Sequence, residues 1–330
     1  MFIKFPSIKN TYSALHIKKW LKLFPELNNA TYAITEKLHG TNTQLIFDKE
    51  QYGDKVLLGT RTQVLPDSEN HYNIMDVYSS DKYQTAVQTI QKHIGNDTVN
   101  LYGEFFGPGI CKNIDYGEKQ IRFFAMMVNG RLMSHNDLRA KFTFLGLDPD
   151  SYLVPLVGLV DGLQQALNFD ITELVSAFTP DGMYKTKQHN TVNSYNLAEG
   201  IVIYPADLVF TYGHSCFILK KKNEWAREHI KKKNPSKKIK PSIKTLRNDF
   251  ERYITKARME SAFSKYGARI QDTREYNIFI PMIINDAKED FMEDFSDELA
   301  KVAPSKDELR FIYNTGSIVA KLLTEELGDQ

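Results

Sequence analysis

Cysteine is scarce in this sequence, with only Cys111 and Cys216 among 330 residues. The two lie far apart and outside any Cys-x-x-Cys pair, which argues against a zinc site and against a disulfide framework. We expect both to be ordinary buried thiols. Long apolar runs are absent as well: no stretch reaches 18 residues, and Met1–Pro6 lacks the apolar core of a signal peptide. The sequence thus predicts a cytoplasmic protein with no membrane partner.

Net charge is also close to zero, at +1, but the balance hides two charged regions. Residues 217–245 contain eleven lysines and arginines and two glutamates, a local charge of +9. Residues 286–330 contain twelve acids and five bases, a local charge of −7. Apolar residues make up 42% of the chain, which is enough for a substantial core, and the length favours two domains.

The first two thirds of the chain are rich in short extended segments. A short amphipathic helix is expected over residues 13–24, with Leu15, Trp20, Leu23 and Phe24 at helical spacing. A second helical segment is expected near 82–94, and helical pieces such as 161–167 occur in the less decisive region 130–195. These features predict an antiparallel, strand-rich α+β core. The expected strands are 31–35, 43–48, 55–60, 99–105, 121–128, 200–204 and 216–220.

The last third has the pattern of a small all-helical domain. One helix is expected from Ile243 to Ala257, between Pro241 and Gly267, and a second over 277–299. A third begins at the capping-box pattern Ser305-Lys-Asp-Glu308. Its expected buried residues are Leu309, Ile312, Val319 and Leu322. The lysine-rich segment 231–241 resembles a linker, so we expect domains at 1–230 and 242–330.

Lys37 stands out within the stretch Glu36-Lys37-Leu38-His39-Gly40-Thr41-Asn42, which joins two extended runs. A lysine at the end of a strand, beside a tight turn, is a candidate nucleophile. It must be neutral to attack, and burial or neighbouring cations would lower its pKa accordingly. Taken alone, the stretch also fits a solvated lysine at the mouth of a hairpin.

Other residues suited to such a site follow along the chain. Arg61 ends a strand, Glu104 is a carboxylate within an apolar, glycine-flanked run, and Glu199 opens a strand. Strand alternation places Phe123 and Phe124 on opposite faces.

The same alternation separates the three lysines of the last expected strand. Lys220 and Lys222 should share one face and Lys221 should take the other.

In chain order, six segments resemble motifs I, Ia, III, IIIa, IV and V of the covalent nucleotidyltransferase superfamily. They are Lys37-Leu-His-Gly40-Thr-Asn42, Gly59-Thr-Arg61-Thr, Tyr102-Gly-Glu104-Phe, Arg122-Phe-Phe124, Ala198-Glu199-Gly-Ile-Val and Lys220-Lys-Lys222-Asn. His39 stands where DNA ligases and capping enzymes carry Asp, which is similar to the RNA ligase 2 family of phages and their relatives. Segments 107–117, 253–258 and 264–267 are also similar to that family.

The resemblance implies an antiparallel-sheet nucleotidyltransferase domain at 1–230 and a helical RNA-binding domain at 242–330. It implies ATP and Mg²⁺ or Mn²⁺ as cofactors, with Lys37 attacking the α-phosphorus of ATP and Glu199 positioning the metal. Lys220 and Lys222 would neutralise phosphate charge, Phe124 would stack on adenine, and Glu104 would bind the ribose. Further contacts to the nucleotide are implied for Glu36, His39, Asn42 and Arg61.

The implied reaction is sealing of RNA ends. AMP would pass from Lys37 to the 5′-phosphate of RNA, and a 3′-OH would then displace AMP. The implied substrate is a nick in duplex RNA bearing 3′-OH and 5′-phosphate ends. The implied protein is a monomer, in the host cytoplasm if a phage encodes it.

Two residues depart from the family pattern, and alternatives remain open. Ala125 stands where the family usually carries Asp, and Tyr204 where it usually carries Lys or Arg. These departures leave open a non-catalytic nucleic-acid binder on the same scaffold. A DNA ligase or a GTP-using capping-type enzyme is the other alternative, disfavoured by His39 and by the helical C-terminal third.

Overall fold

The computed structural model describes residues 1–330 except 69, 111–112, 181–194, 214, 227–241 and 329–330. The chain divides into two compact units, Met1–Trp225 with Lys265–Gly267 and Ala226–Ser264 with Ala268–Gln330. The expected linker 231–241 lies outside the described residues, so its role stays a prediction. Within the described part of the chain, no helix is long and apolar enough to cross a membrane.

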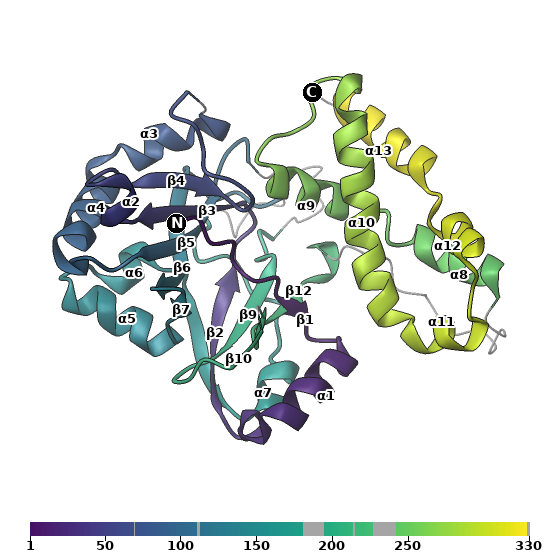
Figure 1. Cartoon of the computed structure of the whole chain (residues 1–330), viewed down its shortest axis with the longest axis horizontal. Coiled ribbons are helices and arrows are strands. Elements are labelled where there is room, and N and C mark those ends of the chain that lie inside the picture. The colour runs from purple at the N-terminus through teal and green to yellow at the C-terminus, as the bar shows by residue number, and fades with distance from the viewer. Residues whose placement is uncertain (69, 111–112, 181–194, 214, 227–241, 329–330) are drawn as a thin grey trace. The chain divides into compact units, whose positions relative to one another are not determined.

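The first unit is built on two five-stranded sheets (Figure 1). Neighbouring strands in both sheets are antiparallel, except that β1 runs parallel to β12. One sheet has the order β1 (Lys9–Asn10), β12 (Leu219–Lys222), β9 (Gly200–Pro205), β2 (Thr31–Lys37) and β8 (Leu156–Asp161). The other has the order β4 (Leu57–Thr60), β3 (Thr41–Phe47), β5 (Val99–Phe106), β6 (Gln120–Val128) and β7 (Arg131–Leu132). The expected α+β class is confirmed.

Alternation along the strands gives each sheet one face toward the other sheet and one face toward helices. Between the sheets lies a core of side chains from β2, β5, β6 and β9, namely Ala33, Tyr102, Ala125, Met127 and Tyr204 with Phe5. The opposite face of the second sheet is covered by α3 (Ile74–Tyr78), α4 (Asp81–Ile94), α5 (His135–Phe144) and α6 (Pro149–Tyr152). The opposite face of the first sheet packs against α1 (Ala14–Leu23) and α7 (Leu163–Asn168).

The remaining short elements of this unit connect the strands. They are α2 (Lys49–Tyr52), the hairpin of β10 (Thr211–Tyr212) with β11 (Ser215–Cys216), and the 3₁₀ turns Pro25–Asn28, His71–Asn73 and Glu224–Ala226. The strand expected over 216–220 is therefore wrong as a single element, because the chain turns where Ile218 N donates to Cys216 O at 3.1 Å. Cys216 is a buried free thiol, as expected, and Cys111 lies outside the described residues.

Helix α1 confirms the expected helix, but its buried face differs from the one we predicted. Ile17 and Trp20 are buried, whereas Leu15 and Leu23 are 53% and 42% exposed. At 3.6 residues per turn, Leu15 lies about 200° around the helix from Ile17, so the two cannot share a face. The true apolar face thus depends on Ile17, which the predicted set omitted.

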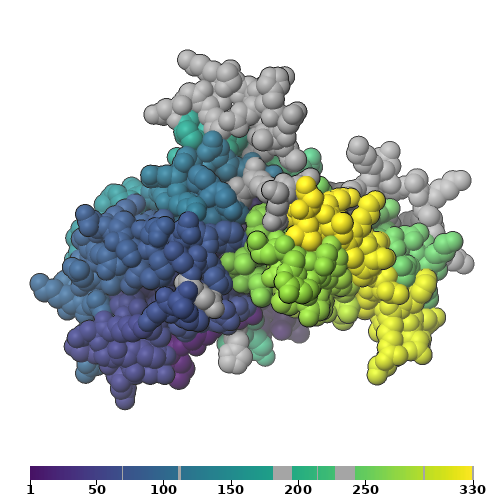
Figure 2. Space-filling model, turned by 90° about the horizontal axis from the view of Figure 1, so that it is seen from above, coloured from purple at the N-terminus to yellow at the C-terminus, as the bar shows by residue number. Residues whose placement is uncertain are grey.

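The second unit is all helical. Its elements are α8 (Ile243–Glu251), α9 (Lys256–Tyr266), the 3₁₀ turn Thr273–Glu275, α10 (Tyr276–Asp294), α11 (Ser296–Val302), α12 (Lys306–Tyr313) and α13 (Gly316–Gly328). Helices α10 and α13 lie side by side in Figures 1 and 2. Apolar side chains such as Phe250, Phe279, Phe291, Ile312 and Leu323 are fully buried.

Each of the three helices expected here is interrupted. The first ends at Glu251, and α9 restarts after Thr255, whose hydroxyl accepts the Arg258 N–H at 3.2 Å as a helix cap does. The second breaks between α10 and α11, and the third between α12 and α13. The capping box at Ser305 and Glu308 is confirmed. Ile312 and Val319 are buried as expected, but Leu309 and Leu322 are only partly buried, and Leu323 fills the core in place of Leu322.

Candidate active site

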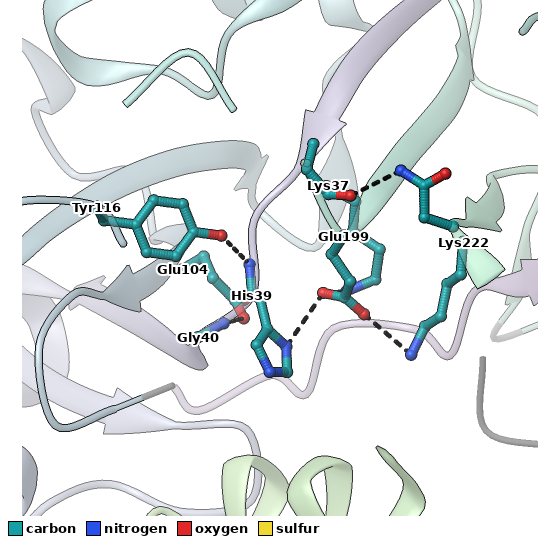
Figure 3. Close-up of polar contacts among 9 residues, drawn as sticks. Lys37, His39, Gly40, Glu104, Tyr116, Glu199 and Lys222 are labelled. Atoms are coloured by element: carbon teal, nitrogen blue, oxygen red, sulfur yellow. Dashed lines mark hydrogen bonds and ion pairs between the residues drawn. The ribbon is translucent and has the colours of Figure 1, made fainter. Parts of the chain in front are cut away.

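Glu199 is the centre of a charged cluster in the first unit (Figure 3). Its Oε2 atom lies 2.6 Å from Lys37 Nζ and 3.4 Å from His39 Nδ1, and its Oε1 atom lies 3.0 Å from Lys222 Nζ. The Glu199 side chain is only 3% exposed, whereas that of Lys37 is 20% exposed. Burial alone would raise the pKa of Glu199, but Lys222, Lys37 and His39 overcome it and hold the pKa well below its ordinary value. Glu199 is therefore an anion at neutral pH.

The strand register explains why these residues meet. Gly200, the first residue of β9, lies opposite Lys37 on β2 and opposite Lys222 on β12. A Cβ atom at Gly200 would lie 1.9 Å from the carbonyl oxygen of Lys221, so a side chain cannot be accommodated there without separating the strands. Glu199, directly before this glycine, thus reaches the lysines of both neighbouring strands.

The three lysines of β12 divide as strand alternation predicts. Lys222 contacts Glu199, whereas Lys221 points to the other face, where its ammonium donates to the carbonyls of Leu167 and Phe169 at 2.9 and 2.7 Å. Lys220 shares the face of Lys222 because side chains repeat every second residue. This part of the basic region is therefore built into the sheet.

The sequence led us to expect cations around Lys37, and the structure differs in one respect. The group in direct contact with Lys37 Nζ is a carboxylate, and Lys222 lies on the far oxygen of that carboxylate. Two cations thus share one buried anion, so the negative charge of Glu199 offsets part of the positive charge of both lysines.

Glu104 joins the cluster through the turn that follows Lys37. Its Oε1 atom accepts the Gly40 N–H at 3.1 Å, and it lies opposite Asn42 in the pairing of β3 with β5. Burial raises the pKa of Glu104 to about 7; Lys37 and His39 oppose this rise and Glu199 adds to it. At neutral pH this carboxyl group is therefore poised between its two protonation states.

Phe124 projects from a bulge in β6. Pairing with β5 skips it, since Tyr102 lies opposite Ala125 and Gly103 opposite Phe123. Phe123 packs under the helices and Phe124 faces the inter-sheet side, which confirms their predicted opposition. The Phe124 ring meets Phe5 edge-on, with ring centroids 5.2 Å apart.

The two departures from the family pattern lie in the same core. Ala125 and Tyr204 are 3% and 8% exposed in the inter-sheet cluster, where uncharged groups avoid the cost of burying a charge. The Tyr204 hydroxyl donates to the Phe124 carbonyl at 3.3 Å. The structure thus gives both residues a packing role beside Phe124.

Two predicted site residues have other partners. Arg61 donates from Nη2 to Ser7 Oγ at 3.2 Å, in the N-terminal segment. Glu36 precedes Lys37 on β2 and therefore points to the opposite face, where its Oε2 accepts the Ala177 N–H at 2.9 Å. The structure does not bring Glu36 together with Lys37, His39, Glu199 and Lys222.

Two residues without an assigned role lie beside the turn after Lys37. The Tyr116 hydroxyl accepts the His39 N–H at 2.8 Å, and the Trp225 ring meets the His39 ring edge-on with centroids 6.0 Å apart. Tyr116 lies in segment 107–117, noted only for its resemblance to the family. The sequence indicated a role for Trp225 only in that it is an aromatic residue three positions after Lys222.

A metal ion here would depend on few protein ligands. Among the described residues, no group of three or more His, Cys, Asp or Glu side chains could hold one. The buried Glu199 carboxylate offers the hard oxygen that Mg²⁺ or Mn²⁺ prefers, and Mg²⁺ commonly keeps several waters besides one or two carboxylates. The residues present therefore fit a metal held mainly by Glu199.

Glu36 predicts a pH dependence of stability. Burial raises the pKa of Glu36 from 4.5 to about 7, against hydrogen bonds from Ser176 and Ala177 that lower it. The folded state then keeps a proton that the unfolded state releases between these values, so the free energy of unfolding falls as pH rises through this window. We expect Glu36→Gln to lessen the fall between pH 5 and 8 by up to about 3 kcal/mol.

Urea unfolding across this pH range measures the effect. The exposed Glu173 supplies the control, because Glu173→Gln should leave the pH profile of the wild type unchanged. Parallel profiles for Glu36→Gln and the wild type would contradict the prediction.

Comparison with known proteins gives a family. The sequence matches the model of the RNA ligase family over residues 30–222, more than half of the 330 residues. Similar solved structures include Naegleria gruberi RNA ligase as a mutant without ligand (15% identity, TM-score 0.43) and as mutants with ATP and Mn (13%, 0.46) or AMP and Mn (14%, 0.44). Each match covers 67% of this chain and 56% of the Naegleria chain. Because the family model matches more than half of the chain, including Lys37, Glu104, Glu199 and Lys222, this chain belongs to the RNA ligase family.

Proposed function

We propose that this protein is an ATP-dependent RNA ligase that works through a lysyl-AMP intermediate at Lys37. The observation that carries the proposal is the Lys37 amine held 2.6 Å from buried Glu199, whose other oxygen contacts Lys222, in a chain of the RNA ligase family. An amine beside a second cation suited to phosphate supports this role for Lys37.

In the first step, Lys37 Nζ attacks the α-phosphorus of ATP. An N–P bond forms, the bond from the α-phosphorus to the β-phosphate oxygen breaks, and pyrophosphate leaves. Lys37 gives two protons to solvent, one before it attacks as a neutral amine and one as the N–P bond forms, and Lys222 and Lys220 neutralise negative charge on the phosphate oxygens. Mg²⁺ or Mn²⁺ at Glu199 would add positive charge at the reacting phosphate.

The nucleotide would be held by groups on both sheets. Phe124 offers a ring face for adenine, Glu104 a carboxylate for ribose hydroxyls, and Arg61 a guanidinium for phosphate. His39 and Asn42 flank the turn. The position of Glu36 on the opposite face of β2 argues against the direct contact with nucleotide that the resemblance implied.

The later steps follow from the same chemistry. AMP passes to the 5′-phosphate of RNA to form a 5′–5′ anhydride, and a 3′-OH then attacks that 5′-phosphate and expels AMP. We propose a nick in duplex RNA as the substrate of a monomeric enzyme, with the helical region 242–330 binding RNA and 231–241 linking it to the nucleotidyltransferase domain. Duplex RNA is recognised largely through its shape and 2′-hydroxyls, which a helical domain can contact without reading the sequence.

Labelling with ATP tests the proposal. Incubation with α-labelled ATP and Mg²⁺ should attach one AMP to each wild-type chain, and Lys37→Arg should remain unlabelled because its guanidinium cannot act as an amine nucleophile. Lys221→Arg is the matched control, because Lys221 lies on the opposite face of β12. Absence of label from the wild type, or equal labelling of Lys37→Arg, would refute lysyl-AMP formation.

The same assay separates the alternatives. Labelling by GTP in preference to ATP would indicate a capping-type enzyme, and tight RNA binding without any label would indicate a non-catalytic binder. Sealing of a 3′-OH/5′-phosphate nick in duplex RNA, compared with a nick in duplex DNA and with single strands, tests the proposed substrate.

A further inference from the structure

The turn after Lys37 is held by side chains from elsewhere in the first unit. The consecutive backbone donors of His39 and Gly40 go to Tyr116 Oη at 2.8 Å and to Glu104 Oε1 at 3.1 Å (Figure 3). A buried backbone N–H needs such a partner. The shape of the turn, and with it the direction of Lys37, therefore depends on where Tyr116 and Glu104 are held.

Tyr116 is itself held by two phenylalanines. It is 2% exposed, and its ring packs near-perpendicular to those of Phe106 and Phe178, with centroids 4.7 and 6.4 Å away. Phe106 and Phe178 also contact each other at 5.1 Å. We call Phe106, Tyr116 and Phe178 the aromatic clasp. The Arg122 guanidinium covers the Phe178 ring at 4.7 Å, a cation–π contact that adds to the packing.

Asn196 joins the two loops that carry Tyr116 and Phe178. Its side-chain amide accepts the Asp115 N–H at 2.7 Å and donates to the Asp115 carbonyl at 2.8 Å and to Thr179 Oγ1 at 2.7 Å. Asn196 is buried and has a φ of 51°, a left-handed conformation that asparagine adopts more readily than most residues. The residues next to Tyr116 and Phe178 are thus bound to one amide group.

Glu36 connects the clasp back to the nucleophile. Its carboxylate accepts the N–H of Ala177, the residue before Phe178. Glu36 directly precedes Lys37, and His39 follows it by two positions. The chain on both sides of Lys37 is consequently tied to the same aromatic cluster, from Glu36 through Ala177 and from His39 through Tyr116.

We propose that Tyr116 is a positioning residue for Lys37: through its bond to His39 N–H, the aromatic clasp, anchored by Glu36, holds the Lys37–Gly40 turn in the conformation that directs the lysine at Glu199. The proposal rests on the proposed function, to which it adds a residue outside the nucleotide contacts. Tyr116 acts on the turn through the His39 N–H.

Tyr116→Phe tests this role because it keeps the ring in the clasp and removes only the hydroxyl group that accepts the His39 N–H. Amide hydrogen exchange followed by NMR should show the His39 N–H exchanging about tenfold faster, since a buried donor that loses its partner loses local protection. The Gly40 N–H, which keeps its bond to Glu104, should change much less and serves as an internal reference.

A matched control is available elsewhere in the same unit. The Tyr83 hydroxyl likewise accepts a backbone N–H, that of Ile121 at 2.8 Å, but on the helix-covered face of β6. Tyr83→Phe should speed exchange at Ile121 and leave His39 unchanged. Equal exchange of His39 in the wild type and in Tyr116→Phe would overturn the proposal.

Kinetics give the second readout. At saturating ATP, we expect Tyr116→Phe to form lysyl-AMP about tenfold more slowly, while the ATP concentration for half-maximal rate changes less than twofold, because a misdirected lysine impairs attack and not binding. A rate within twofold of the wild type would contradict the proposal.

Two further arms keep the test decisive. If Tyr116→Phe does not fold, Phe178→Leu loosens the clasp without touching the turn and should produce smaller changes of the same kind; unchanged His39 exchange there would overturn the proposal. If the wild type forms no lysyl-AMP, the proposed function fails, and the exchange measurement alone still decides whether Tyr116 holds the turn.

Discussion

Replacing Glu199 with glutamine should slow lysyl-AMP formation by roughly 100-fold or more, because loss of one partner from a buried charge pair commonly costs several kcal/mol. The amide has nearly the shape of the carboxylate, but it carries no charge to balance Lys37 and Lys222, and its NH₂ group would face an ammonium. It is also a poorer ligand for Mg²⁺ or Mn²⁺. Single-turnover labelling with α-labelled ATP across a titration of the metal measures both consequences.

The control for this prediction is again Glu173→Gln, which removes a carboxylate from the surface of the same unit. It should keep the rate of the wild type. If Glu199→Gln formed lysyl-AMP at a rate within fivefold of the wild type, the charged cluster around Glu199 would not be the site of the reaction. A lower rate restored fully by excess metal would assign Glu199 to metal binding more than to charge balance.

The second large effect concerns stability, in the helical unit. Arg258 is completely buried, and its guanidinium contacts the carboxylates of Asp286 and of Asp290, the latter at 2.7 Å, while its Nε donates to the Tyr253 carbonyl at 2.8 Å. The two aspartates lie four residues apart on α10 and would repel each other without it. We expect Arg258→Met to destabilise this unit by about 3–5 kcal/mol, because it removes the buried cation that the two acids share.

Thermal and urea unfolding of the whole chain would measure this loss. Circular dichroism would follow the helical region, which contains no tryptophan. Arg274 provides the contrast: its side chain is 89% exposed and pairs with Asp272, so Arg274→Met should cost less than about 1 kcal/mol. Similar losses for the two variants would show that the buried pairs contribute no more than a surface pair. The triple change of Arg258, Asp286 and Asp290 to apolar residues should recover much of the stability.

Arg258 also changes how the acidic surplus of residues 286–330 is interpreted. From the sequence, this segment was described only by its count of twelve acids against five bases. In the structure, Asp286 and Asp290 bind Arg258, Asp294 accepts from the Tyr253 hydroxyl at 2.7 Å, and Glu326 binds Arg269. Part of the surplus is thus internal, balanced by arginines outside the segment that was counted.

The candidate site shows what pattern analysis could predict. Lys37, Glu104, Glu199 and Lys222 were all found from the order of short segments, although 162 residues separate Lys37 from Glu199. The alternation of β12 was also correct. Glu36 could have been excluded by the same rule, since neighbours in a strand face opposite sides, and the family resemblance outweighed that signal.

Asn196 had no comparable signal, and Tyr116 had only its place in segment 107–117, which resembles the family. An asparagine beside a polar loop differs in no visible way from others in the chain. Their roles arise from a contact between two loops, in which Asn196 bonds to Asp115, 81 positions earlier in the sequence. The helix interruptions at Thr255 and Asn314 had only weak local signals, and apolar periodicity alone could not predict them.

By itself, the sequence determined the class of the fold, many of the strands and the charged residues of the candidate site, because period-two alternation, turn residues and charged side chains at strand ends are local properties. The tertiary structure alone decided which charges meet, which lysine contacts Glu199, that a carboxylate and not a cation contacts Lys37, and that Tyr116 accepts the His39 N–H. These contacts depend on strand register and loop packing, which join residues that are distant in the chain. A local sequence pattern therefore cannot predict them.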